Sequence, residues 1–155
     1  MAVKQRKAPR YDTCTPATPA ASKAKRHNPP KGTRAEVLLR CALWAKDLRY
    51  RLHAKELPGK PDIVFRRQHL AVFVDGDFWH GRDWEKRRKK LAKGSNADYW
   101  LAKIGYNIER DRKSSELLED MGWTVLRFWE TDLLDDPEIA VQEITDALAR
   151  LASGQ

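Results

Sequence analysis

The chain has few cysteines and no long apolar run. Only Cys14 and Cys41 occur among 155 residues, which argues against a disulfide framework or a cysteine-rich zinc site. No apolar stretch approaches the roughly 20 residues that span a bilayer, and no hydrophobic segment of a signal peptide follows the first residues. These absences predict a soluble, cytoplasmic protein that does not bind a membrane.

Acidic residues are also in deficit, because 30 Lys and Arg face 22 Asp and Glu and give a net charge of +8. A basic surface of this kind favours a polyanionic partner. Nucleic acid is therefore the first candidate. An acidic membrane surface is the competing one, although nothing in the sequence would anchor the chain there.

Two regions differ in composition. Residues 1–31 are rich in Lys, Arg, Pro, Ala, Thr and Ser and have almost no large apolar side chains, which predicts a disordered basic N-terminal arm. Such an arm could contact phosphates by charge or could serve only as a solubilising tail. Residues 32–155 are sufficient for one hydrophobic core and are predicted to form a single domain.

The pattern of apolar residues predicts the elements of that domain. A capping box formed by Thr33 and Glu36 begins the first helix, and Gly122 ends a later one. The expected elements are a helix over 34–48, strands over 49–53, 61–65 and 70–80, a helix over 97–121 that could break at Gly105, a strand over 123–129, and a helix over 135–152. This order predicts an α/β fold with a mixed central sheet flanked by helices.

Two carboxylates mark neighbouring strands. Asp62 stands at the start of one apolar strand and Asp75 near the end of the next, 13 positions later across a turn. Lateral pairing of these strands could place both side chains around a divalent ion, because hard cations prefer oxygen ligands. Magnesium held in this way supports hydrolysis of a phosphodiester. The alternative is that both are ordinary turn or cap residues.

Two further residues could complete such a site. Glu36 offers a third carboxylate, although its position in the capping box could equally give it a role at the helix start alone. His80 follows the second acidic strand and could transfer protons, because the reference pKa of histidine lies near neutrality. A structural histidine is the simpler alternative.

Basic residues gather after His80. The expected contacts to the DNA backbone are Lys86, Arg87, Arg88 and Lys89 in a dense run, with Arg110 and Arg112 on the following helix. Contacts of this kind add affinity and salt dependence more than sequence choice. A solvated helical face is the alternative for the dense run.

Four segments resemble the very short patch repair endonucleases: Leu-Pro-Gly-Lys-Pro-Asp-Ile-Val-Phe at 57–65, Val-Asp-Gly-Asp-Phe-Trp-His-Gly at 74–81, Tyr-Trp-Leu-Ala-Lys-Ile-Gly-Tyr-Asn-Ile-Glu-Arg-Asp-Arg at 99–112, and Met-Gly-Trp-Thr-Val-Leu-Arg-Phe-Trp-Glu at 121–130. The resemblance covers residues 32 to 150. It implies the restriction-endonuclease-like fold of the PD-(D/E)xK superfamily. It also implies a monomeric, nucleoid-associated enzyme that uses Mg²⁺ to nick double-stranded DNA beside a T:G mismatch, with mismatch-repair proteins as partners.

The resemblance assigns roles to residues. Asp62 would be the central metal ligand, Glu36 would assist it, and His80 would be the catalytic histidine. Phe78, Trp79 and Trp100 would intercalate at the mismatch. Such a wedge costs a few kcal/mol of stacking, and least where pairing is already weak. Core packing is the alternative role for these three aromatic residues.

The sequence departs from the family at two places. The family's structural zinc is bound at positions that read here Asp77, Arg82, Trp84 and Thr131; three of the four are not ordinary zinc ligands, so zinc is predicted to be absent. Asp75 stands where the family has histidine. This favours Asp62 and Asp75 as the metal pair, as in PD-(D/E)xK nucleases, although Asp77 stands where those nucleases have lysine.

Asp77 could bind a second ion or fill the vacated zinc position, and the second role is favoured. Two other functions stay open. One is a restriction-like, sequence-specific endonuclease that acts on paired DNA. The other is a DNA-binding module of the same fold that has lost cleavage after the change to Asp75.

Overall fold

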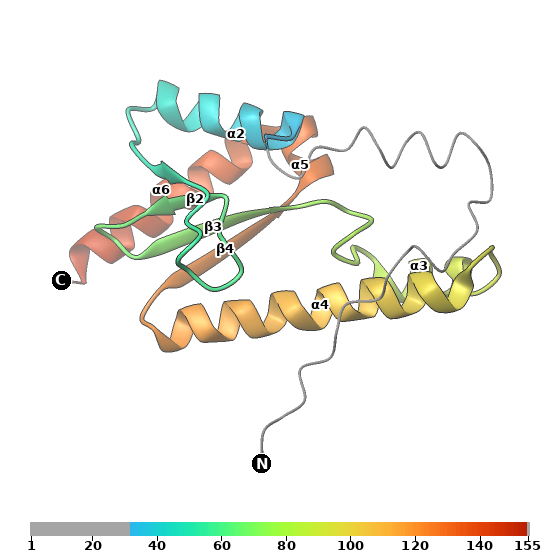
Figure 1. Cartoon of the computed structure of the whole chain (residues 1–155). Coiled ribbons are helices and arrows are strands. Elements are labelled where there is room, and N and C mark those ends of the chain that lie inside the picture. Colours follow the sequence, from blue (N-terminus) through green and yellow to red (C-terminus); the bar gives the residue numbers. More distant parts are fainter. Residues whose placement is uncertain (1–31, 155) are drawn as a thin grey trace, which may run out of the picture.

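The computed structural model describes residues 32–154, so the basic arm predicted for residues 1–31 lies outside the described residues. The elements are α2 (Arg34–Ala45), β1 (Arg51–Leu52), β2 (Ile63–Phe65), β3 (Leu70–Asp75), α3 (Trp84–Leu91), α4 (Ala97–Asp120), β4 (Thr124–Trp129), α5 (Glu130–Asp135) and α6 (Pro137–Ser153). Helices α2, α5 and α6 cover one face of the sheet and the long helix α4 covers the other (Figure 1). No helix in this part of the chain is long and apolar enough to cross a membrane.

The four strands form one mixed sheet in the order β1-β2-β3-β4. Strand β2 pairs antiparallel with β1 and with β3, whereas β3 and β4 run parallel. Ile63 lies opposite Val72, and Asp75 lies opposite Trp129. The prediction of an α/β fold with a mixed sheet between helices is therefore confirmed.

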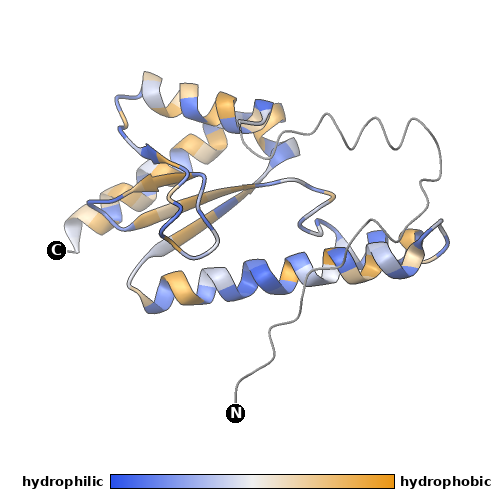
Figure 2. Ribbon diagram, viewed as in Figure 1, coloured by the Kyte–Doolittle hydropathy of each residue, from blue (hydrophilic) through white to orange (hydrophobic). Residues whose placement is uncertain are grey.

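The sheet is apolar on both faces because both faces are covered, and Figure 2 shows its central strands mostly in the hydrophobic colour. On one face, Ile63 and Val72 pack with Leu39 of α2 and Ile144 of α6 in the larger core cluster. On the other face, Val64, Ala71 and Phe73 pack with Leu118 of α4. Alternate residues of β2 and β3 thus enter two different cores, which fixes their register.

Helix α2 begins as its capping box predicts. The Glu36 backbone N–H donates to Thr33 Oγ1 at 3.3 Å. The Glu36 side chain folds back and Oε2 accepts from the Gly32 N–H at 2.9 Å, one residue before the N-cap position that a standard capping box uses. Glu36 is 2 % exposed, so the helix start holds a carboxylate inside the protein.

Several boundaries differ from the expectation. Helix α2 ends at Ala45 rather than near residue 48, and the strand expected over 49–53 is limited to Arg51–Leu52. The final helix begins at Pro137, with Asp136 as its N-cap. The short helix α5 precedes it and was missed because it follows β4 without any turn residue.

The break considered at Gly105 does not occur, because α4 is continuous over 24 residues. A Cβ added at Gly105 would meet no atom within 4 Å outside its own helix. Gly122 ends the helix with a φ of +83°, as predicted. The i→i−4 hydrogen bonds of α4 therefore outweigh the weak helix propensity of one glycine.

We expect Gly105→Ala to stabilise the protein by about 0.5–1 kcal/mol, because alanine loses less backbone entropy on entering a helix. Gly59→Ala is the contrasting variant. Its Cβ would lie 2.8 Å from the Cβ of Ser114 at a φ of +72°, so the substitution should be destabilising. Urea unfolding of the two variants and the wild type measures both effects, and a loss of stability in Gly105→Ala would contradict the continuous helix.

Candidate active site

Asp62 lies just before β2 and is fixed to the neighbouring strand by its side chain. Its Oδ2 accepts a hydrogen bond from the Val74 N–H at 2.8 Å, and its own N–H donates to the Val72 carbonyl at 3.1 Å. Burial raises the pKa of Asp62 to about 6, the Val74 hydrogen bond opposes that rise, and the negative charges of Glu36 and Asp75 add to it. A cation bound beside a carboxylate in this environment would stabilise its ionised form.

Asp62 belongs to a group with Glu36 and His53, whose potential ligand atoms all lie within 4.8 Å of one another. His53 Nε2 is 3.4 Å from Glu36 Oε1. The side chain of Glu36 is only 3 % exposed, and this buried oxygen has no hydrogen-bond partner. An orphaned carboxylate oxygen beside Asp62 fits a hard divalent cation, so the residues present suit Mg²⁺.

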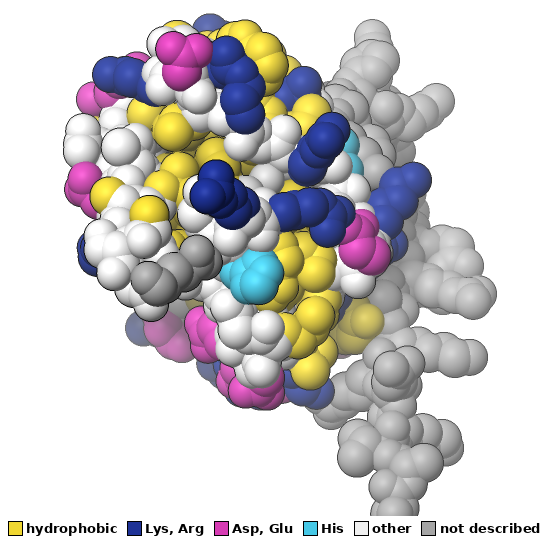
Figure 3. Space-filling view, turned by 90° about the vertical axis from the view of Figure 1, so that its left-hand side faces the viewer, with side chains coloured by type: hydrophobic (Ala, Val, Ile, Leu, Met, Phe, Trp, Pro, Cys, Tyr) yellow, Lys and Arg dark blue, Asp and Glu magenta, His cyan; other side chains and the backbone are white. Residues whose placement is uncertain are grey.

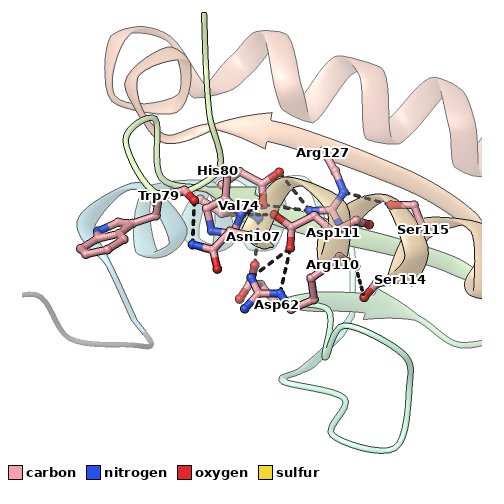
Figure 4. Close-up of polar contacts among 11 residues, drawn as sticks. Asp62, Val74, Trp79, His80, Asn107, Arg110, Asp111, Ser114, Ser115 and Arg127 are labelled. Atoms are coloured by element: carbon pink, nitrogen blue, oxygen red, sulfur yellow. Dashed lines mark hydrogen bonds and ion pairs between the residues drawn. The ribbon is translucent and has the colours of Figure 1, made fainter. Parts of the chain in front are cut away.

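Asp75, His80 and Asp111 form a second group with the same spacing limit. His80 Nδ1 lies 2.5 Å from Asp111 Oδ2 and 3.5 Å from Asp75 Oδ1 (Figure 4). Gly81 lets the loop approach α4 closely, since a Cβ there would lie 2.4 Å from Ile108 Cδ1. The histidine of the β3 loop therefore meets an acid in the middle of α4.

Opposing effects set the protonation of this pair. Burial alone would lower the pKa of His80, but the hydrogen bond to Asp111 and the charges of Asp75 and Asp111 raise it above its ordinary value. Burial would raise the pKa of Asp111, but His80 and Arg110 hold it below its ordinary value. The pair therefore favours an imidazolium beside a carboxylate, an arrangement suited to proton transfer.

Arg127 of β4 occupies the other side of Asp75. Its Nη1 donates to both Asp75 oxygens at 3.0 Å, its Nη2 donates to the Asp111 carbonyl at 3.2 Å, and its Nε donates to Ser115 Oγ at 3.1 Å. The charge of Asp75 is thus already balanced by an arginine. Asp62 and Asp75, predicted as one metal pair, belong to different side-chain groups, and only Asp62 is grouped with Glu36.

Sequence reasoning missed three residues of these groups. His53 was read only as part of a strand, and no spacing rule connects it with Asp62. Asp111 is one of several consecutive charged residues in its helical segment, so nothing in the sequence distinguished it from its neighbours. Arg127 did carry a signal, because it interrupts the otherwise apolar strand Thr124–Trp129. A lone charge in a strand of this kind requires a buried partner.

Three of the positions that the resemblance assigns to a structural zinc, Asp77, Arg82 and Thr131, lie together here without cysteine or histidine. The Thr131 N–H donates to Asp77 Oδ1 at 3.3 Å, and its hydroxyl donates to Asp77 Oδ2. Arg82 Nη1 lies 3.5 Å from Asp77 and 2.8 Å from Asp132. Ion pairs and hydrogen bonds therefore join the loop after β3 to the start of α5.

The aromatic residues predicted to intercalate form one cluster. Ring centroids lie 5.2 Å apart for Phe78 and Trp79, 5.4 Å for Phe78 and Trp100, and 5.8 Å for Trp79 and Trp100. All three side chains are partly exposed. Asn107 of α4 is 4 % exposed and donates from Nδ2 to the Trp79 carbonyl at 2.9 Å, which fixes the loop that carries the cluster beside His80.

The predicted backbone contacts divide into two sets. Lys86, Arg88 and Lys89 lie exposed on α3, which has no buried residue, and the guanidinium of Arg87 stands 5.6 Å from the Phe78 ring. Arg110 bonds Asp111, and Arg112 is held between Glu109 and Glu116. Helix α3 is therefore the better placed of the two for a polyanion.

Comparison with known proteins gives related sequences. The model of the DNA mismatch endonuclease Vsr family matches residues 11–86. The type II nicking enzyme V.HpaIIP of Haemophilus parainfluenzae is 44% identical over 118 residues, 76% of this chain and 82% of that protein. The type II nicking enzyme V.NaeI of Lentzea aerocolonigenes is 38% identical over 144 residues, 90% of this chain and 82% of that protein.

A third relative is the DNA mismatch endonuclease Vsr of Escherichia coli strain K12, which is 31% identical over 125 residues, 81% of this chain and 78% of that protein. These likenesses run through the segments that carry Asp62, His80 and the aromatic cluster. The resemblance suggested by those segments is confirmed, and the chain belongs to the Vsr family of DNA endonucleases.

Proposed function

We propose that the protein is a Mg²⁺-dependent endonuclease that nicks duplex DNA at or next to a T:G mismatch. The observation that carries this proposal is the orphaned Oε1 of Glu36, buried beside Asp62. Asp75 and His80, from the second group, both affect the pKa of Asp62. The site therefore places potential metal ligands near a proton-transfer pair, and both are needed for phosphodiester hydrolysis.

Asp62 and Glu36 would hold the metal, with His53 beside them. Mg²⁺ bound there would supply an activated water and neutralise charge on the phosphate. Asp75 serves a different role from the one predicted, because Arg127 binds both of its oxygens. We assign it to fixing Arg127 and His80 in position.

His80 would move the proton. Its Nδ1 is engaged by Asp111, which orients the ring and leaves Nε2 as the atom that exchanges a proton with water or with the leaving oxygen. Asp111 stabilises the imidazolium, as the raised pKa of His80 indicates. Asp111 is thus a positioning residue for His80.

The mismatch would be recognised by Phe78, Trp79 and Trp100. Their partly exposed rings form one cluster on the loop that carries His80 and on the start of α4. Separating a weak T:G step costs less than separating paired bases, so insertion favours mismatched DNA. The Escherichia coli relative is named a DNA mismatch endonuclease, which supports recognition of a mismatch.

A second function is nicking at a specific sequence in fully paired DNA, because two of the relatives are named type II nicking enzymes. The deciding experiment incubates the full chain with Mg²⁺ and matched duplexes that carry a T:G or a T:A pair at the same position. We expect one strand of the T:G duplex to be nicked at least about 10-fold faster, given the stacking cost of the wedge. Equal nicking of both duplexes would support the sequence-specific function, and binding with no scission would contradict both.

Asp62→Asn should abolish nicking and preserve DNA binding, because it removes the charge that would hold the metal. Without metal it should also stabilise the protein at pH 8 by about 1–2 kcal/mol, since the folded chain no longer buries a carboxylate. The pKa of Asp62 rises from 3.8 to about 6 on folding. The difference should shrink as the pH falls through 6 and should disappear below about pH 3, where both states hold the proton.

Asp120→Asn is the matched control, because it makes the same chemical change at an exposed residue and should not alter nicking. Nicking rates, DNA affinity in EDTA and urea unfolding at pH 3 and pH 8 are the measurements. Full nicking activity in Asp62→Asn would remove Asp62 from the site.

We also propose that the chain binds no structural zinc, because none of Asp77, Arg82 and Thr131 is Cys or His and both oxygens of Asp77 already accept hydrogen bonds from Thr131. Elemental analysis of the purified protein should find less than about 0.1 zinc per chain, since structural zinc sites are built from Cys and His ligands that this cluster does not offer. Chelator should leave the unfolding curve unchanged. One zinc per chain would overturn the assignment.

A further inference from the structure

A groove of about 730 Å³ opens beside the candidate active site. Helix α2 forms one wall with Arg40 and Trp44, and Tyr50, Arg51 and His53 line it from the region of edge strand β1. Arg66, from the turn between β2 and β3, also contributes. Figure 3 faces the side of the molecule at which α2 ends and shows Lys and Arg side chains standing around exposed hydrophobic surface.

The groove joins the potential metal site directly. His53 lines the groove and lies 3.4 Å from Glu36 Oε1. Arg40, on the opposite wall, lies 3.8 Å from the same oxygen. A strand whose phosphate reaches Glu36 and Asp62 would therefore have its neighbouring phosphates close to the groove.

The side chains that line the groove are of the kinds that bind a single nucleic-acid strand. Three arginines face one acid, Glu56, which is paired with Arg66. Trp44 is 55% exposed; the Arg49 guanidinium stands 3.7 Å from its ring centroid, and its ring meets that of Tyr50 edge to face with centroids 6.3 Å apart. Arginine suits phosphate, and exposed aromatic rings suit a sugar or an unstacked base.

We propose that this groove binds the DNA strand on one side of the bond to be cut, with Arg51 and Arg66 on successive phosphates and Trp44 against a sugar or base. The proposal deepens the proposed function and rests on it for the position of the cut. A groove of about 730 Å³ has room for a few nucleotides of one strand and not for a duplex. Neither arginine was among the DNA contacts expected from the sequence.

The test is equilibrium binding of the full chain to a labelled duplex in EDTA at several salt concentrations. Arg51→Ala/Arg66→Ala should bind about 10-fold more weakly at 0.1 M salt, and the slope of log K against log salt should fall by about 2, one for each lost phosphate contact. Arg67→Ala/Arg150→Ala is the control. It removes the same charge from exposed residues outside the groove and should change the slope by less than about 0.5.

Glu56→Gln should increase the affinity for DNA, an effect that a misfolded variant would not produce. Removing the acid frees Arg66 from its ion pair, so DNA should bind about 2- to 3-fold more tightly. Unchanged or weaker binding by Glu56→Gln would contradict a phosphate contact by Arg66. If the two double variants lost the same DNA affinity, the proposal that the groove binds DNA would be contradicted, because the lower net charge alone would explain the loss.

Different results contradict DNA binding by the groove and nicking of mismatched DNA. Binding in EDTA needs no scission, so wild-type protein that binds but never nicks would contradict only the function. Wild-type protein that nicks T:G duplexes, with a groove variant that binds like its control, would contradict only the groove.

Discussion

The antiparallel pairing of β2 with β3 is the constraint on which the rest of the structure depends. It places Val74 so that its N–H donates to Asp62 Oδ2, and it sets Asp75 at the end of the neighbouring strand. Because the two faces of these strands enter different cores, a slip of one residue would bury the wrong side chains. The position of the acidic residues is therefore maintained by hydrophobic packing.

Around this pairing the protein builds two separate polar groups. In the group of Glu36, His53 and Asp62, the buried Glu36 Oε1 accepts no hydrogen bond and has only the longer contacts to His53 and Arg40, so a bound cation would stabilise it. Asp75, His80, Asp111 and Arg127 are mutually satisfied. In the proposed function the first group would bind the metal and the second would transfer protons. Such a division lets each group be fixed by its own neighbours.

The sequence was sufficient to predict the mixed sheet, the ends of α4 and the start of α2, because capping residues, Gly122 and strand periodicity are local signals. It also identified the segment from Asp75 to His80. It could not reveal His53, Asp111 or Arg127 as parts of the site, since their importance arises only when β1, α4 and β4 come together. Asp75 shows the same limit, because the sequence predicts it as a metal ligand and gives no sign that both of its oxygens accept hydrogen bonds from Arg127.

Helix α4 carries residues of two kinds on one rigid rod. Trp100 lies near its start and Asp111, the partner of His80, lies near its middle. Eleven residues of helix span about 16 Å, and the helix is continuous through Gly105, which lies between them. The spacing between Trp100, one ring of the proposed wedge, and the partner of His80 is therefore set by the rise of a single helix, so α4 would hold these two parts of the proposed site at a constant separation.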